Sequence, residues 1–86
     1  MNRHTKDLSA QLGSLLRSRQ LTVTCAESCT GGGIASAITD IAGSSQWFHA
    51  GFVTYANDVK EQLLDVSPET LMSEGAVSES VVRQMV

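Results

Sequence analysis

Apolar residues recur along the first half of the chain in two alternating patterns. Helical spacing near the N-terminus predicts an amphipathic helix over about Asp7 to Arg19, after a frayed start at Met1–Asp7. Leu21 to Cys25 is apolar or β-branched on both faces, as expected of a strand covered by helices on both sides. Helical spacing returns from Gly33 to about Ile41. The order helix, strand, tight turn, helix predicts an α/β fold.

The second half begins with another strand pattern. The aromatic and β-branched run Trp47–Tyr55 predicts a strand, in which Gly51 indicates a bulge or a close backbone approach. Asn57 is expected to cap a helix that runs through Leu64, and Ser67 a short helix that Gly75 ends. Ser78 should cap the last helix, whose predicted apolar side consists of Val81, Val82, Met85 and Val86.

The final apolar stripe has no stop signal after it, and two strands leave several helices with too little sheet to cover. With 86 residues, the chain makes one small domain at most. We therefore expect residues 1–86 to be a single domain that is either a fragment or completes its core with a partner.

Composition and charge exclude several classes of protein. Hydrophobic residues at 42% and charged residues at 17% indicate a folded chain, and a net charge of −3 gives no footprint for nucleic acid or anionic membranes. No apolar run reaches the length of a membrane span, and the start lacks a signal-peptide pattern, so a cytoplasmic location is expected. Cys25 and Cys29 would need two further ligands for a metal site, and the only imidazoles are those of His4 and His49. No metal is expected.

The segment Ala26–Gly33 carries the most suggestive chemistry. It links the first strand to the next helix, so Ser28 should lie at the carboxyl end of a strand beside backbone N–H groups. Ser28 is either a nucleophile or a simple helix cap. The glycines Gly31–Gly33 match neither the P-loop nor the dinucleotide fingerprint, but their amides can approach a phosphate or an oxyanion closely.

A serine nucleophile needs a base, and Lys60 is the best motivated candidate. In the first turn of its predicted helix, the positive end of the helix dipole opposes an ammonium charge and favours the neutral amine. Tyr55 should reach the same sheet edge and could relay a proton or orient a substrate. Glu27 could cap backbone donors or bind a polar group of the substrate. The alternatives are a solvated surface lysine and a packed strand-end tyrosine.

Four blocks occur in the order and spacing of one family. Ala26–Gly32, Gly43–Ser45, Gly51–Asn57 with Lys60, and Gly75–Ser78 closely resemble the C-terminal domain of the competence and damage inducible CinA family. The resemblance runs from about Leu21 to the end of the chain. It looks like the stand-alone form, without a preceding molybdopterin-binding type of domain, and truncated before further strands and a second glycine-rich, basic segment.

The resemblance implies an amidohydrolase, the nicotinamide-nucleotide amidase, which converts nicotinamide mononucleotide and water to nicotinic acid mononucleotide and ammonia. It implies a three-layer α/β/α domain with a mostly parallel sheet, of which only the N-terminal part is present, and assembly into homo-oligomers. No metal or other cofactor is implied. The implied catalytic residues are Ser28, Lys60 and Tyr55, and the implied substrate-binding residues are Glu27, Cys29, Thr30, Gly31 and Gly32.

Two alternatives to an active amidase stay open. One is a nucleotide-binding module without turnover, which uses the glycine turn and helix N-termini for a phosphate. The other is a structural fragment that folds only by association through its last helix.

Overall fold

Helix α1 (Arg3–Ser18) opens the computed structural model, which describes residues 2–86. The Asn2 side chain caps this helix by accepting from the Thr5 backbone N–H at 2.8 Å. The expectation of a frayed start was therefore wrong for residues 3–7, because an N-cap supplies the acceptor that the first helical amides lack. Met1, also part of that expectation, lies outside the described residues.

The end of α1 explains why the first strand begins later than expected. Gln20 adopts a left-handed conformation (φ 56°), Leu21 N–H donates to the Leu16 carbonyl at 2.9 Å, and Gln20 N–H donates to Arg17. These two bonds form a Schellman-type cap, so the backbone of the residues just after the helix is not extended. Strand β1 consequently covers Val23–Glu27 instead of Leu21–Cys25.

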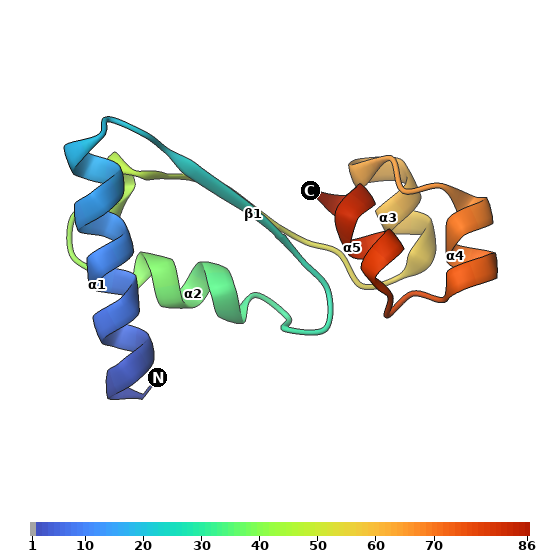
Figure 1. Ribbon diagram of the computed structural model, residues 1–86, viewed down its shortest axis with the longest axis horizontal. Helices are drawn as coiled ribbons and strands as arrows, with labels where there is room; N and C mark the ends of the chain where they lie inside the picture. Colours follow the sequence, from blue (N-terminus) through green and yellow to red (C-terminus); the bar gives the residue numbers. More distant parts are fainter. Residues whose placement is uncertain (1) are drawn as a thin grey trace. The chain divides into compact units, whose positions relative to one another are not determined.

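The chain divides into two units. The first consists of the chain up to Cys25 together with Gly32–Phe52, and the second of Ala26–Gly31 with Val53–Val86. Besides α1, the first unit contains α2 (Gly33–Thr39), which packs against α1, and a short 3-10 helix, η1 (Ser44–Gln46) (Figure 1). It also holds most of β2 (Phe48–Val53).

Strands β1 and β2 form the sheet of the described chain, and they run parallel. Val23 N–H donates to the Trp47 carbonyl at 2.7 Å near the start of β1, and Thr54 N–H donates to the Glu27 carbonyl at 2.8 Å at its end. Both strands therefore advance in the same direction, and their carboxyl ends meet. The predicted α/β class and the parallel sheet are confirmed.

Two glycines of the first unit lie close to neighbouring side chains. A Cβ at Gly51 would lie 3.1 Å from Phe48 Cζ and 3.3 Å from Ala35 Cβ, which confirms the predicted close approach. A Cβ at Gly13 would lie 2.5 Å from Cζ2 of the buried Trp47. Gly13 therefore lowers the helix propensity of α1 but admits the indole ring.

We expect Gly13→Ala to destabilise the fold. Overpacking against a buried ring costs about 1–3 kcal/mol, which exceeds the roughly 1 kcal/mol gained from helix propensity. Urea unfolding followed by circular dichroism measures the difference. The matched control is Gly33→Ala at the start of α2, where nothing lies within 4 Å of an added Cβ. Equal loss of stability in both variants would contradict the packing explanation.

Three helices form the bulk of the second unit: α3 (Asn57–Leu64), α4 (Pro68–Glu74) and α5 (Glu79–Met85) (Figure 1). Helix α5 packs against both α3 and α4. The buried core consists of Val66, Leu71 and Val81, with Leu64, Ala76 and Met85 packed around it. Fully burying each such aliphatic side chain contributes about 1.5–3 kcal/mol.

The caps of α4 and α5 were predicted correctly. Ser67 Oγ accepts from Thr70 N–H and Ser78 Oγ accepts from Val81 N–H, both at 3.3 Å. Ser67 Oγ also donates to Glu69 Oε2 at 2.8 Å, and this hydrogen bond lowers the pKa of the Glu69 carboxyl.

Two other details of these helices differ from the predictions. Ala56 is the N-cap of α3 and makes no side-chain cap bond, so Asn57 is the first helical residue. On α5, Val81 is fully buried, whereas Val82 and Val86 are exposed. The pairs 81/85 and 82/86 lie on neighbouring stripes of the helix, and one stripe suffices to contact α3 and α4.

Candidate active site

Ser28 directly follows the last residue of β1 and begins the turn that the sequence predicted. Gly31 N–H donates to the Ser28 carbonyl at 2.9 Å and closes that turn. Gly31 (φ 61°) and Gly32 (φ 99°) both adopt left-handed conformations, which glycine adopts at little cost. No atom lies within 4 Å of a Cβ built at Gly31, so backbone conformation, and not crowding, requires glycine there.

The predicted site residues fall mostly in the second unit. Glu27, Ser28, Cys29, Thr30 and Gly31 belong to it, as do Tyr55 and Lys60, whereas Gly32 belongs to the first unit. The common scaffold is the junction at which Thr54 N–H donates to the Glu27 carbonyl. Because Ser28 and Tyr55 each come one residue after a member of this pair, the two candidates emerge from the same point of the sheet.

A side-chain hydrogen bond joins two of the predicted site residues, Glu27 and Thr30. Thr30 Oγ1 donates to Glu27 Oε1 at 2.6 Å, a length typical of a hydroxyl on a carboxylate. The Glu27 side chain is 2% exposed, whereas Thr30 is exposed at the surface of the turn. Their bond spans Ser28 and Cys29.

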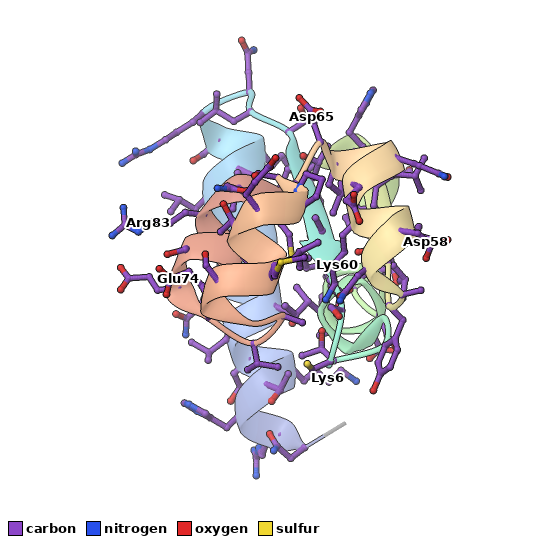
Figure 2. All side chains as sticks on the ribbon, turned by 90° about the vertical axis from the view of Figure 1, so that its right-hand side faces the viewer. Lys6, Asp58, Lys60, Asp65, Glu74 and Arg83 are labelled. Carbon is purple, nitrogen blue, oxygen red and sulfur yellow. The ribbon has the colours of Figure 1, made fainter. Side chains whose placement is uncertain are left out.

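Lys60 is almost completely buried, with 3% of its surface exposed. It is the fourth residue of α3, and its backbone N–H donates to the Ala56 carbonyl at 3.2 Å. Figure 2 shows Lys60 near the middle of the view and Asp58, which is exposed, at its edge. A lysine is rarely this buried, because the ammonium loses its hydration. Lys60 is therefore not the solvated surface lysine that the sequence left as an alternative.

The structure does not join Ser28 and Lys60 by a hydrogen bond, and within residues 2–86 Lys60 has no side-chain hydrogen bond or ion pair. Tyr55 follows Thr54 and is 72% exposed, so its ring is not the packed strand-end aromatic of the alternative interpretation. Cys29 is also exposed, in the turn, and Cys25 lies within β1.

Thr54 is a residue of the site that the sequence reading missed. It is 1% exposed, and its Oγ1 donates to the Glu27 carbonyl at 3.3 Å, beside the backbone bond to the same oxygen. The signal available in the sequence was a hydroxyl residue immediately before Tyr55 at the end of a strand. That position is too common for threonine to have been singled out.

No cluster of three or more His, Cys, Asp or Glu side chains could hold a metal ion in residues 2–86. No helix there combines the length and the apolar character needed to cross a bilayer.

The fold and the turn together define an α/β protein that presents a serine after a parallel strand, next to left-handed glycines, and that contains a buried lysine in its third helix. The sequence matches the family described as CinA C-terminal domain over residues 5–86. The chain belongs to this family, as the motifs of the turn had indicated.

Relatives and solved structures agree with this assignment. The chain is 61% identical over 79 residues to a protein of Enterobacter agglomerans and 60% identical over 78 residues to one of Escherichia coli K12, both named nicotinamide-nucleotide amidohydrolase PncC. These matches cover 92% and 91% of this chain but 48% and 47% of the relatives. The chain thus spans about half the length of these relatives.

The crystal structure of the competence/damage inducible protein CihA from Agrobacterium tumefaciens superposes with a TM-score of 0.97 at 45% identity, over 99% of this chain and 52% of that one. The competence damage-inducible protein A from Klebsiella pneumoniae gives 0.91 at 38% identity, over 94% and 50%. The described fold is therefore that of about half of each of these proteins.

Proposed function

We propose that the chain carries the nucleophile and base of an amidohydrolase that acts on the carboxamide of nicotinamide mononucleotide. The observation that carries this proposal is the burial of Lys60 in the unit that also contains the Ser28 turn. The names of the relatives supply the substrate class.

In the proposed reaction, Ser28 Oγ attacks the carboxamide carbon and its proton passes to Lys60 Nζ. The carbonyl oxygen becomes an oxyanion, for which the Thr30 backbone amide is a candidate donor, since the Gly31 amide already donates to the Ser28 carbonyl. Collapse of this intermediate breaks the C–N bond. The departing nitrogen takes up the proton that Lys60 received and leaves as ammonia, so Lys60 is again a neutral amine and an acyl ester remains on Ser28.

Water then attacks the ester carbon and passes a proton to Lys60. The bond from this carbon to Ser28 Oγ breaks, Lys60 returns the proton to Oγ, and nicotinic acid mononucleotide is released. A neutral amine is required at the start of each half-reaction. Lys60 is buried and lies in the first turn of α3, in the same unit as Ser28. Tyr55, exposed beside this region, is proposed to orient the substrate through its hydroxyl.

The experiment is to incubate the 86-residue chain with nicotinamide mononucleotide and to measure the ammonia and the nicotinic acid mononucleotide that are released. The two products should appear in equal amounts. Free nicotinamide, which has the same carboxamide but no ribose phosphate, is the matched control substrate. We expect release from the nucleotide at least tenfold faster than from the control. A folded chain that binds the nucleotide without releasing ammonia would instead support the binding module without turnover.

Location and assembly are also proposals. We propose a cytoplasmic enzyme that forms homo-oligomers, as the family resemblance implies. Sedimentation of the purified chain tests the assembly, and a monomer across the micromolar range would contradict it.

A further inference from the structure

Glu27 is a buried carboxyl group that the proposed reaction does not use. It lies one residue before Ser28, and the sequence left its role open between capping backbone donors and binding substrate. Its Oε1 accepts from Thr30 Oγ1 at 2.6 Å, within the range of hydroxyl–carboxylate bonds. Because Thr30 comes three residues later, this bond ties the two sides of the turn that contains Ser28.

The main chain of Glu27 is anchored as well. Its carbonyl oxygen accepts two bonds from the buried Thr54, one from the backbone N–H at 2.8 Å and one from Oγ1 at 3.3 Å. Residue 27 is therefore fixed on one side to the segment after β2 and on the other to the turn. The Gly31 N–H bond to the Ser28 carbonyl completes the closure.

We propose that Glu27 is a positioning residue, which with Thr30 and Thr54 as partners fixes the backbone of the turn that presents Ser28. The proposal rests on the proposed role of Ser28 as nucleophile. Glu27 and Thr30 are then not substrate-binding residues but partners in a hydrogen bond within the turn. The short bond already engages Glu27 Oε1 and the hydroxyl hydrogen of Thr30. A displacement of a reacting group by about 1 Å can cost ~10²-fold in rate.

Thr30 is the best position for a test, because it is exposed and a change there leaves the buried carboxyl in place. Thr30→Val removes the hydroxyl and keeps the shape of the side chain, and Thr30→Ser keeps the hydroxyl. Thr24→Val, at an exposed position in β1, is the matched control for the same exchange.

We expect Thr30→Val to lower kcat for ammonia release by about 10- to 100-fold, with KM changed less than about threefold. Thr30→Ser should keep kcat within about threefold of the wild-type value, and Thr24→Val should have the wild-type kcat. If Thr30→Ser lowered kcat as much as Thr30→Val does, the assigned role of the hydroxyl bond between Thr30 and Glu27 would be wrong.

Two readouts do not depend on the substrate. Hydrogen exchange of the Gly31 amide, followed by NMR, reports whether the turn stays closed. Labelling by a fluorophosphonate reports the reactivity of Ser28, since its Oγ bonds to phosphorus, fluoride leaves, and the hydroxyl proton passes to solvent. We expect Thr30→Val to speed the exchange and to slow the labelling, each by at least tenfold.

Unchanged Gly31 exchange in the Thr30→Val chain would overturn the proposal, whatever its activity. Faster exchange together with slower labelling would support it even when the wild-type chain releases no ammonia. That last result would count against the proposed amidase function alone, so the two failures are distinguishable.

Discussion

Ser28→Ala should abolish ammonia release from nicotinamide mononucleotide. Without the hydroxyl no acyl ester can form, and removal of a serine nucleophile lowers kcat by about 10⁴-fold or more in comparable enzymes. Ser28 is half-buried, and its side chain makes no hydrogen bond within the described chain, so the loss of one oxygen should leave the fold unchanged. Steady-state assays that detect both products measure the effect.

Two controls sharpen this test. Ser45→Ala changes an exposed serine of η1 in the same way and should keep full activity. Binding of nicotinic acid mononucleotide to the Ser28→Ala chain, measured by calorimetry, should match the wild type within a few-fold. A variant that turns over at the wild-type rate would disprove the assignment of Ser28 as nucleophile.

Two replacements of Lys60 should distinguish its role as a base from the effect of its positive charge on stability. Lys60→Met keeps an unbranched side chain of similar volume but has no amine to accept the serine proton. We expect kcat to fall by about 10²–10⁴-fold, the range for loss of a general base. The free energy of unfolding should stay the same or rise by about 1 kcal/mol, because an apolar side chain replaces a polar one that costs free energy to bury.

Lys60→Arg provides the opposite combination. Arginine keeps a positive charge that it cannot give up, so it should be as inactive as Lys60→Met. It should also lose stability, by roughly 2–4 kcal/mol, since a larger, permanently charged group enters a buried position. Urea unfolding with parallel activity assays measures both properties. Full activity in either variant would exclude Lys60 as the base.

Lys6→Met is the matched control for both changes, because Lys6 is an exposed lysine of α1 (Figure 2). Its replacement should change neither kcat nor the free energy of unfolding by more than about 0.5 kcal/mol. A similar loss of activity there would mean that the assay responds to net charge and not to the site.

The class of fold and the Ser28 turn were predictable because both depend on local sequence. Helical and strand periodicity gave the order of elements, and the serine caps at Ser67 and Ser78 are bonds between residues three apart. The boundaries were less accurate. The Asn2 cap makes α1 begin earlier than predicted. The Schellman-type cap at Gln20 makes β1 begin two residues later than predicted.

What the sequence alone determined is thus the α/β class, the position of Ser28 in the turn between the first strand and the next helix, and the family to which the chain belongs. Each follows from residues close together in the chain or from motifs in a fixed order. Only the tertiary structure decided that Lys60 is buried, that Gly13 admits the Trp47 ring, and that Thr54 and Thr30 hold Glu27. Burial and pairing depend on residues that chain folding brings together. The sequence around Lys60 allows a solvated surface lysine, and only the fold shows that Lys60 is buried. The Thr54 bond to Glu27 joins residues 27 apart in sequence.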